Sequence, residues 1–419
     1  MNRVFGLDIH KHFAEVAVLE PGAPRPSRLR FPATADGVRA FAAKLGPEDR
    51  VALESCTNAF AFHRLLSEHA GQVVVSNPLK TRVIAEAKVK TDKVDAEILA
   101  RLLAADFLPP VWVPDVATDA LRHLVLHRHG LVQQRTQAKN RIHAILHRNL
   151  IAPEFTDLFG KGGRQWLGAV ELPAEERRLL EADLRLIDFL NSEVATAEQQ
   201  LARTASEDPE VLRLLTIPGI STTSAVALKA AIGDVKRFRS PHHLVSYFGL
   251  NPAVYQSGQK AYTGHISRRG RSHARSVCVE AAHMLVRTPG PFRAFFHRLA
   301  RRKPHNVAIT AVARKLTVLV WHMLTSEEDY HYSPPSSTRR KIAQIRRLTT
   351  GRRARRGELP GPALDRTHDR DIGNRGEADY EEFIRGRFGP QGPPGVEHPN
   401  RKPRNITQRK KSRSSSKTT

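Results

Sequence analysis

Hydrophobic and polar positions over the first 108 residues follow two periods. Short apolar runs bounded by turn residues are typical of buried strands, and apolar residues three and four apart are typical of amphipathic helices. The runs predict strands near residues 3–9, 13–20, 27–31, 50–54 and 72–76. Helical spacing predicts helices near residues 36–45, 59–69 and 91–105. Because two adjoining strands precede alternating helices and strands, we predict a mixed sheet flanked by helices, an α/β domain over residues 1–108.

The pattern becomes helical after a cluster of prolines at positions 109, 110 and 114. Apolar residues at helical spacing predict a helix over residues 117–150 and a second long helix over 174–204. A loop containing Gly160, Gly162 and Gly163 separates them. We therefore predict a long helical, coiled-coil-like arm within residues 109–205, whose role is either internal packing or subunit association.

Residues 206–330 predict a further, mostly helical domain. Its first feature is a tight turn, Ile217-Pro218-Gly219-Ile220, that leads into an Ala-rich helix. This pattern resembles a helix-hairpin-helix element, in which Pro218 and Gly219 contact the nucleic-acid backbone, although an ordinary turn has the same pattern. The most apolar segment, Ala308 to Leu324, is interrupted by Arg314 and Lys315, so we predict a buried helix and no membrane partner.

From residue 331 onward the composition shifts to Pro, Ser, Arg and Gly with few aliphatic residues. This segment contains 22 Lys and Arg against 9 Asp and Glu, about half of the net charge of the chain. We predict a disordered basic tail over residues 331–419, which either binds nucleic acid loosely or only keeps the chain in solution.

The composition of the whole chain indicates a polyanionic partner. Lys and Arg total 67 against 42 acidic residues, which gives a net charge of +25, and the pI is about 10.7. Nucleic acid is the expected partner, with binding that weakens as salt increases. Two distant cysteines, Cys56 and Cys278, and an N-terminus without a signal-peptide core are typical of a reducing cytoplasm.

Four carboxylates stand out in this basic chain. Asp8 ends the apolar run Val4–Leu7, and Glu54 ends the run Val51–Leu53, so both lie at the tips of predicted strands. Asp92 and Asp95, three residues apart after a predicted N-cap at Thr91, share one helix face. Clustered carboxylates resist ionising together unless a divalent cation such as Mg²⁺ or Mn²⁺ binds them. The four acids therefore indicate metal-assisted phosphodiester chemistry.

A second polar constellation follows Asn251. Ser257 stands next to Gly258, and a polar loop of this kind leaves a hydroxyl accessible. Lys260, Arg268, Arg269 and Arg271 follow, and they are suited to neutralising a phosphate while a serine attacks phosphorus. The residues alone leave two interpretations open, a nucleophile or an ordinary turn, and His265 is either a base or a solvent-facing loop residue.

The ordered motifs resemble those of the insertion-sequence-110 family, the DEDD transposases. They are Gly-Leu-Asp-Ile-His-Lys at 6–11, Leu-Glu-Ser at 53–55, Lys-x-Asp-x-x-Asp-Ala at 90–96, Ile-Pro-Gly-Ile at 217–220, Tyr-Phe-Gly-Leu-Asn-Pro at 247–252, Gln-Ser-Gly at 256–258 and Ile-Ser-Arg-Arg-Gly at 266–270. The likeness spans about residues 1–326, so the basic tail lies outside it.

The resemblance implies an RNase H-like, RuvC-like N-terminal domain and a C-terminal transposase domain. It implies that Asp8, Glu54, Asp92 and Asp95 form the metal-binding tetrad and that Ser257 forms a transient phosphoserine link to DNA. It also implies donor and target DNA as partners, pairing with a structured guide RNA, and a bacterial, nucleoid-associated location. Because the tetrad and the serine lie in different domains, we expect a homo-oligomer, a dimer or tetramer.

Two other functions share some of these features. A hydrolytic RuvC-like junction resolvase or nuclease needs the four acids but uses water as the nucleophile, which leaves Ser257 structural. A noncatalytic nucleic-acid-binding protein needs only the basic surface, with the acids capping helices and pairing with Lys90 and Lys93.

Overall fold

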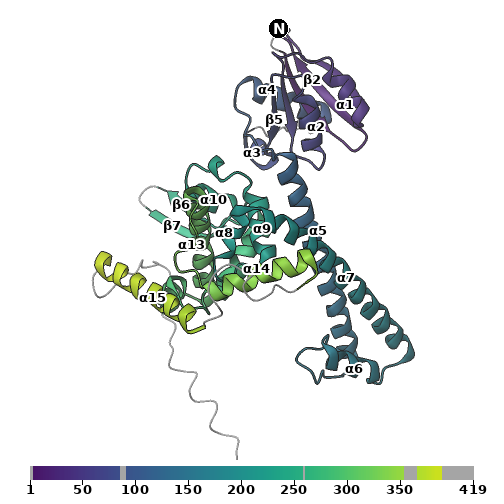
Figure 1. Cartoon of the computed structure of the whole chain (residues 1–419). Helices are drawn as coiled ribbons and strands as arrows, with labels where there is room; N and C mark the ends of the chain where they lie inside the picture. The colour runs from purple at the N-terminus through teal and green to yellow at the C-terminus, as the bar shows by residue number, and fades with distance from the viewer. Residues whose placement is uncertain (1–2, 85–90, 258–259, 353–365, 389–419) are drawn as a thin grey trace, which may run out of the picture. The chain divides into compact units, whose positions relative to one another are not determined.

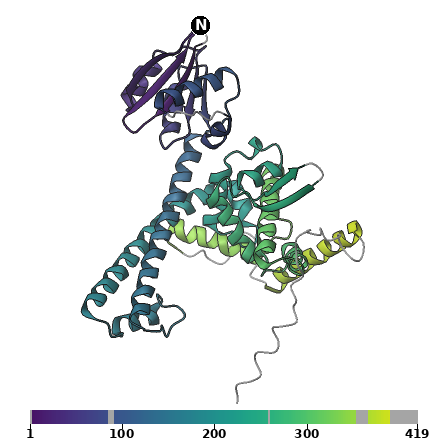
Figure 2. The ribbon, with the colours of Figure 1, turned by 180° about the vertical axis from the view of Figure 1, so that it is seen from behind.

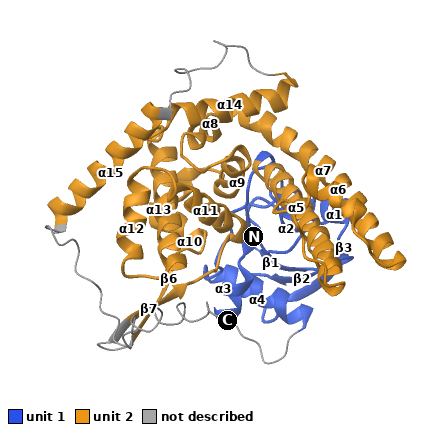
Figure 3. Ribbon diagram, turned by 90° about the horizontal axis from the view of Figure 1, so that it is seen from below, with its two compact units in different colours: residues 1–117 blue, residues 118–419 orange. Residues whose placement is uncertain are grey.

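The computed structural model describes residues 3–84, 91–257, 260–352 and 366–388. The chain divides into two compact units, residues 1–117 and residues 118–419, which Figure 3 shows in different colours. Each unit has hydrophobic clusters of its own, so each is described by itself.

Unit 1 is built on a five-stranded sheet (Figure 1). Its strands are β1 (Val4–Ile9), β2 (Phe13–Leu19), β3 (Ser27–Pro32), β4 (Arg50–Glu54) and β5 (Gln72–Ser76). The spatial order is β3-β2-β1-β4-β5; β1 pairs antiparallel with β2 and parallel with β4. The predicted mixed sheet and its five strands are confirmed, and the arrangement is consistent with an RNase H-like domain.

Helices cover both faces of this sheet. They are α1 (Ala35–Ala42), α2 (Ala59–Leu66), α3 (Pro78–Ile84) and α4 (Asp92–Ala104). Because strand residues alternate between faces, Phe5 and Leu7 share a core with α1 and α2, whereas Val4 and Ala52 share one with α4. Helix α3 is the element of this unit that the sequence pattern did not predict.

A glycine allows α4 to approach β1 closely. A Cβ atom added at Gly6 would lie 2.6 Å from the backbone nitrogen of Ala100 and closer still to the carbonyl oxygen of Ala96, so no side chain fits there. Gly6 and Asp8 are two residues apart and therefore face the same side of the sheet. Close packing at Gly6 consequently brings the first turn of α4, with Asp92, near Asp8.

The helical arm in unit 2 consists of α5 (Val116–Arg148), α6 (Lys161–Ala169) and α7 (Ala174–Glu207) (Figures 1 and 2). Helices α5 and α7 run antiparallel, as four side-chain pairs between them show: Arg128–Glu198, Arg135–Asn191, Arg141–Asp183 and Arg148–Glu176. The predicted arm is confirmed. The glycine-containing connection was predicted as a loop only, which was wrong, because Gly163 packs against Leu158 and the buried Leu167 completes a short helix.

The remainder of unit 2 is mostly helical, as predicted. Its elements up to residue 326 are α8 (Pro209–Leu215), α9 (Thr222–Ile232), the 3₁₀ helix η1 (Val235–Arg237), α10 (Pro241–Tyr247), β6 (Pro252–Ser257), β7 (Lys260–Ile266), α11 (Ser272–Leu285), α12 (Pro291–Ala300) and α13 (His305–Ser326). Among the described helices, α13 alone is long and apolar enough to cross a membrane, with a mean hydropathy of 1.5. It lies in the largest core cluster, as the prediction of a buried helix requires.

Two further helices, α14 (Pro335–Thr350) and α15 (Arg366–Phe388), form where the composition predicted disorder. Ile345 of α14 is buried, and Lys341 donates hydrogen bonds to the carbonyls of Leu215 and Ile217 at 2.6 and 2.7 Å. For these segments the prediction was wrong, because a few aliphatic side chains at helical spacing are enough to dock a helix that is otherwise basic. Residues 353–365 and 389–419 lie outside the described residues.

Replacing Gly6 with valine should displace α4 from β1. Overpacking of this kind costs about 1–3 kcal/mol or more, so faster hydrogen exchange is expected in peptides covering β1 and α4, with a lower Tm. Gly130→Ala is the matched control, because Gly130 has open space around it and alanine favours helix α5. Unchanged exchange in Gly6→Val would show that the close approach is not needed.

Deleting residues 331–419 should lower the Tm by several degrees, because it uncovers the surface under Ile345 and leaves two carbonyls without Lys341. Deleting residues 389–419 removes none of the described residues and should leave the Tm unchanged. Differential scanning calorimetry of the two truncations makes the comparison. Equal Tm values would mean that α14 contributes nothing to stability.

Candidate active site

Asp8 and Glu54 lie at one edge of the sheet in unit 1. Strands β1 and β4 are parallel, with Leu7 opposite Leu53, so the acid that follows each leucine falls at the same end. Asp8 is half-buried, with 14% of its side chain exposed. The carboxyl ends of neighbouring parallel strands meet at this edge, and the predicted placement of both acids at strand tips is confirmed.

Asp92 and Asp95 lie in the first turn of α4. Thr91 is the N-cap, and its hydroxyl accepts a hydrogen bond from the amide of Val94 at 3.4 Å. The cap fixes the start of the helix, and a three-residue step then puts both carboxylates on one face. Asp92 lies beside Asp8, and Asp95 is near enough to raise the pKa of Asp8.

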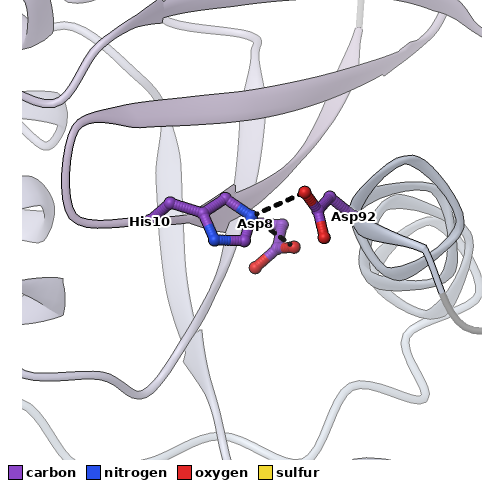
Figure 4. Close-up of side chains that lie close together, drawn as sticks. All are labelled: Asp8, His10 and Asp92. Carbon is purple, nitrogen blue, oxygen red and sulfur yellow. Dashed lines mark ion pairs between the residues drawn. The ribbon is translucent and has the colours of Figure 1, made fainter.

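His10 completes this cluster, as Figure 4 shows. Its Nε2 atom lies 3.2 Å from an oxygen of Asp8 and 3.2 Å from an oxygen of Asp92. The Nε2 atom is buried and pairs with both carboxylates. An imidazole nitrogen that converges with two carboxylate oxygens is a donor set that suits a metal ion.

The electrostatics of the cluster agree with this interpretation. Burial raises the pKa of the Asp8 carboxyl, and the nearby carboxylates of Asp92 and Asp95 raise it further, while His10 has the opposite effect. Without a cation, therefore, the cluster resists full ionisation. A divalent cation would remove that repulsion.

The donor set fits a divalent cation. One ligand atom each from Asp8, His10 and Asp92 lies within 4.8 Å of the other two. Carboxylate oxygens suit Mg²⁺ and Mn²⁺, and a neutral imidazole nitrogen adds a borderline ligand. Glu54 and Asp95 are not in this group of three. The sequence reasoning missed His10 as a ligand, although its position two residues after Asp8 near the end of a strand was the available signal.

Ser257 belongs to unit 2, and the four acids belong to unit 1. It was predicted in a polar loop; the structure instead makes it the last residue of β6, which pairs antiparallel with β7 in a two-stranded sheet. Lys260, the first residue of β7, is opposite Ser257 in the register. Gly258, predicted to leave the hydroxyl accessible, lies outside the described residues.

The predicted basic residues after the hairpin differ in their surroundings. Arg268 and Arg269 are exposed, and Arg268 has a left-handed backbone, with φ of 55°. The side chain of Arg271 instead donates a hydrogen bond from Nε to the hydroxyl of Tyr247 at 2.8 Å. His265 is exposed, as a loop histidine would be, but it lies in strand β7. Two arginines are thus open to a phosphate, and the third is partly engaged.

Pro218 and Gly219 lie between α8 and α9, so the predicted tight turn before the Ala-rich helix is present. Gly219 has a φ of 80°, and an added Cβ atom would lie 2.8 Å from Cβ of Met284 in α11. The turn therefore packs against α11. It also lines a pocket of about 570 Å³, whose basic lining residues are Arg287, Arg293, Arg340 and Arg370.

Two family models match the chain. One of the DEDD type, described as a transposase, matches residues 5–150, which include β1, β4 and α4. The other, described as the transposase IS116/IS110/IS902 family, matches residues 211–297, which include the β6–β7 hairpin. The two matches fall in different units of the structure except for residues 118–150.

Similar proteins carry consistent names. A probable family 20 transposase of Pseudomonas aeruginosa is 28% identical over 310 residues, 70% of this chain and 88% of that protein. The transposase for insertion sequence element IS1328 of Yersinia enterocolitica is 29% identical over 287 residues, 66% of this chain and 83% of that protein. A pilin gene-inverting protein of Moraxella bovis is 28% identical over 280 residues, 64% and 77% of the two chains.

The ordered motifs, the acidic edge of the sheet and both family matches agree. A DEDD domain implies use of a divalent metal, and a transposase binds DNA. The chain belongs to the IS110 family of transposases, enzymes that catalyse DNA transposition.

Proposed function

We propose that this transposase cuts and rejoins DNA strands through a phosphoserine at Ser257, assisted by Mg²⁺ or Mn²⁺ at an acidic site in a RuvC-like domain. The observation that carries the metal site is the convergence of the buried Nε2 atom of His10 with one oxygen each of Asp8 and Asp92. The domains would be a catalytic domain over residues 1–108, the arm over 109–205 and a transposase domain over 206–330, followed by the basic tail.

In the acidic site, Asp8, Asp92 and His10 would hold the cation, with Glu54 and Asp95 completing its surroundings. His10 would bind as the neutral imidazole, with its proton on Nδ1. The bound cation supplies charge stabilisation at the scissile phosphate. The carboxylates fix its position at the edge of the sheet, and the close packing at Gly6 maintains the spacing between Asp8 and Asp92.

In the serine step, Oγ of Ser257 loses its proton and attacks phosphorus, and the bond from phosphorus to the 3′ oxygen breaks. The 3′ oxygen leaves with a proton, and the 5′ phosphate stays on the serine. The new ester keeps the energy of the broken bond, so another 3′ hydroxyl can reverse the reaction without an external energy source. Lys260, opposite Ser257 in the register, would offset the charge that develops on the phosphate, and Arg268, Arg269 and Arg271, which follow the other end of the hairpin, would contact phosphates further along the DNA.

Strand exchange needs both halves of the site together. The acids and Ser257 belong to different units. We therefore propose a homo-oligomer in which the serine of one subunit reacts at the acidic site of another subunit. The exposed apolar residues of α7, Leu179, Leu186 and Phe189, are available for contact between arms. One relative is named a pilin gene-inverting protein, and inverting a gene requires that cut strands be rejoined, which favours rejoining over hydrolysis for this chain.

The nucleic-acid partners would be donor DNA, target DNA and a structured guide RNA encoded by the element. The net charge of +25 supports several polyanionic contacts on one chain. Pro218 and Gly219 would contribute to such a contact at the rim of the basic pocket, where the turn borders Arg287 and Arg340. The choice of DNA sequence would then come from base pairing between the guide RNA and the DNA.

Ser257→Ala should abolish strand exchange and the covalent protein–DNA adduct. The measurement is denaturing electrophoresis of the reaction with the ends of the element, Mg²⁺ and guide RNA, followed by mass spectrometry of the linked peptide. Ser326→Ala is the matched control, since Ser326 is an exposed serine of the same unit, at the end of α13 and outside the hairpin. Cleavage by Ser257→Ala without an adduct would identify a hydrolytic nuclease instead.

His10→Ala should weaken Mn²⁺ binding at least about tenfold, because it removes one of three converging ligand atoms. Isothermal titration calorimetry on the Ser257→Ala background measures this without catalysis. Asp8→Asn should weaken binding further, and Asp36→Asn, at a fully exposed surface position, should have no effect. If His10 only neighbours the carboxylates, its removal would leave the affinity unchanged or increase it.

A further inference from the structure

Two tyrosines form an exposed stack on the β6–β7 hairpin. Tyr255 and Tyr262 are opposite each other in the register, and their ring centroids are 5.1 Å apart with an interplanar angle of 18°. The exposed fractions are 53% and 58%. Both rings therefore stack on each other while more than half of each residue faces solvent.

A glycine makes room for this stack. A Cβ atom added at Gly264 would lie 3.1 Å from Cε2 of Tyr255, which is closer than ordinary van der Waals contact. The ring of Tyr255 thus lies against the bare backbone of β7. Glycine beneath an aromatic ring on a neighbouring strand holds that ring flat across the strands. The orientation of the pair is fixed by the hairpin.

Stabilisation of the hairpin explains why the two tyrosine rings stack on each other, but it does not explain why they are exposed to solvent. An isolated two-stranded sheet is marginal, so a cross-strand aromatic pair contributes to it. The pair nevertheless leaves a large aromatic surface in solvent. Exposed cationic and polar residues follow in the same segment: His265, Ser267, Arg268 and Arg269. Aromatic faces together with cations further along the same segment are a combination that binds single-stranded nucleic acid.

We propose that Tyr255 and Tyr262 form a platform on which an unpaired base of the cleaved DNA strand stacks, beside the scissile phosphate. This rests on the proposed role of Ser257. Two residues along a strand span about 7 Å, so Tyr255 precedes Ser257 by a distance comparable with one nucleotide of an extended strand. The platform would hold the strand in position for attack, with Arg268 and Arg269, which follow the other end of the hairpin, on phosphates further along the strand.

The chemistry of stacking fits this enzyme. Every base has a π-face, so a tyrosine platform accepts any sequence. That tolerance suits an enzyme whose target choice would come from base pairing elsewhere. A stacked base must also be unpaired, so the platform favours DNA whose strands have opened at the cleavage point.

The test uses the full chain and a short oligodeoxyadenylate that carries one 2-aminopurine. Stacking should quench 2-aminopurine fluorescence on binding to the unaltered protein. Tyr262→Leu should remove the quenching and weaken binding by about 5- to 150-fold, whereas Tyr262→Phe, which keeps the ring, should bind within about twofold. The slope of binding against salt should stay the same in Tyr262→Leu, because phosphate contacts remain, but should fall in Arg269→Gln.

A direct measurement covers the case in which Tyr262→Leu disrupts the hairpin. Light-induced cross-linking of the unaltered protein to an oligonucleotide with 5-iododeoxyuridine should link Tyr255 or Tyr262. Cross-links elsewhere, or no quenching in the unaltered protein, would overturn the platform. Binding of oligoriboadenylate but not of oligodeoxyadenylate would overturn its assignment to DNA.

The outcome is separable from that for the nucleophile. An adduct on another residue, with quenching still dependent on Tyr262, would leave the platform in place and remove the role of Ser257. An adduct on Ser257 without quenching of 2-aminopurine would support the role of Ser257 and remove the platform.

Discussion

The contact between helix α4 and strand β1 determines the acidic site. A side chain at Gly6 would hold the helix away from the sheet, and Asp92 would then be too far from Asp8 to share a cation. The N-cap Thr91 sets where the helix begins, and the packing of Leu99 and Leu103 sets its distance from the sheet. The geometry of a polar site thus depends on apolar packing about two and three helical turns away.

The same contact has an electrostatic cost that the fold tolerates. Burial and two neighbouring carboxylates raise the pKa of Asp8, and the buried Nε2 atom of His10 is the only group of the cluster that lowers it. Strain of this kind is common where a ligand supplies the missing interaction. The hydrophobic clusters on both faces of the sheet keep the strands and α4 in place despite this local repulsion.

The sequence predicted much of unit 1, because alternation and helical spacing are local signals and each strand has a clear apolar run. It also predicted both arm helices, whose apolar stripes extend over many turns. It missed α14, whose buried residue Ile345 stands among arginines, and it missed His10 as part of the cluster. The docking of α14 and the position of His10 depend on contacts with residues distant in the sequence. Composition averaged over a segment does not show such contacts. The hairpin at Ser257 was missed for a related reason, since short polar strands carry little apolar signal.

The hydrogen bonds of Lys341 link the docking of α14 to proton binding. Burial, with a smaller contribution from the charge of Arg340, lowers the pKa of this amine to about 7. In the unfolded chain the pKa would return to about 10.4. Between these values the unfolded chain binds the additional proton, so the free energy of unfolding rises with pH across this interval. The helix that joins the basic tail to the α8–α9 turn is thereby held more firmly in alkaline than in neutral solution.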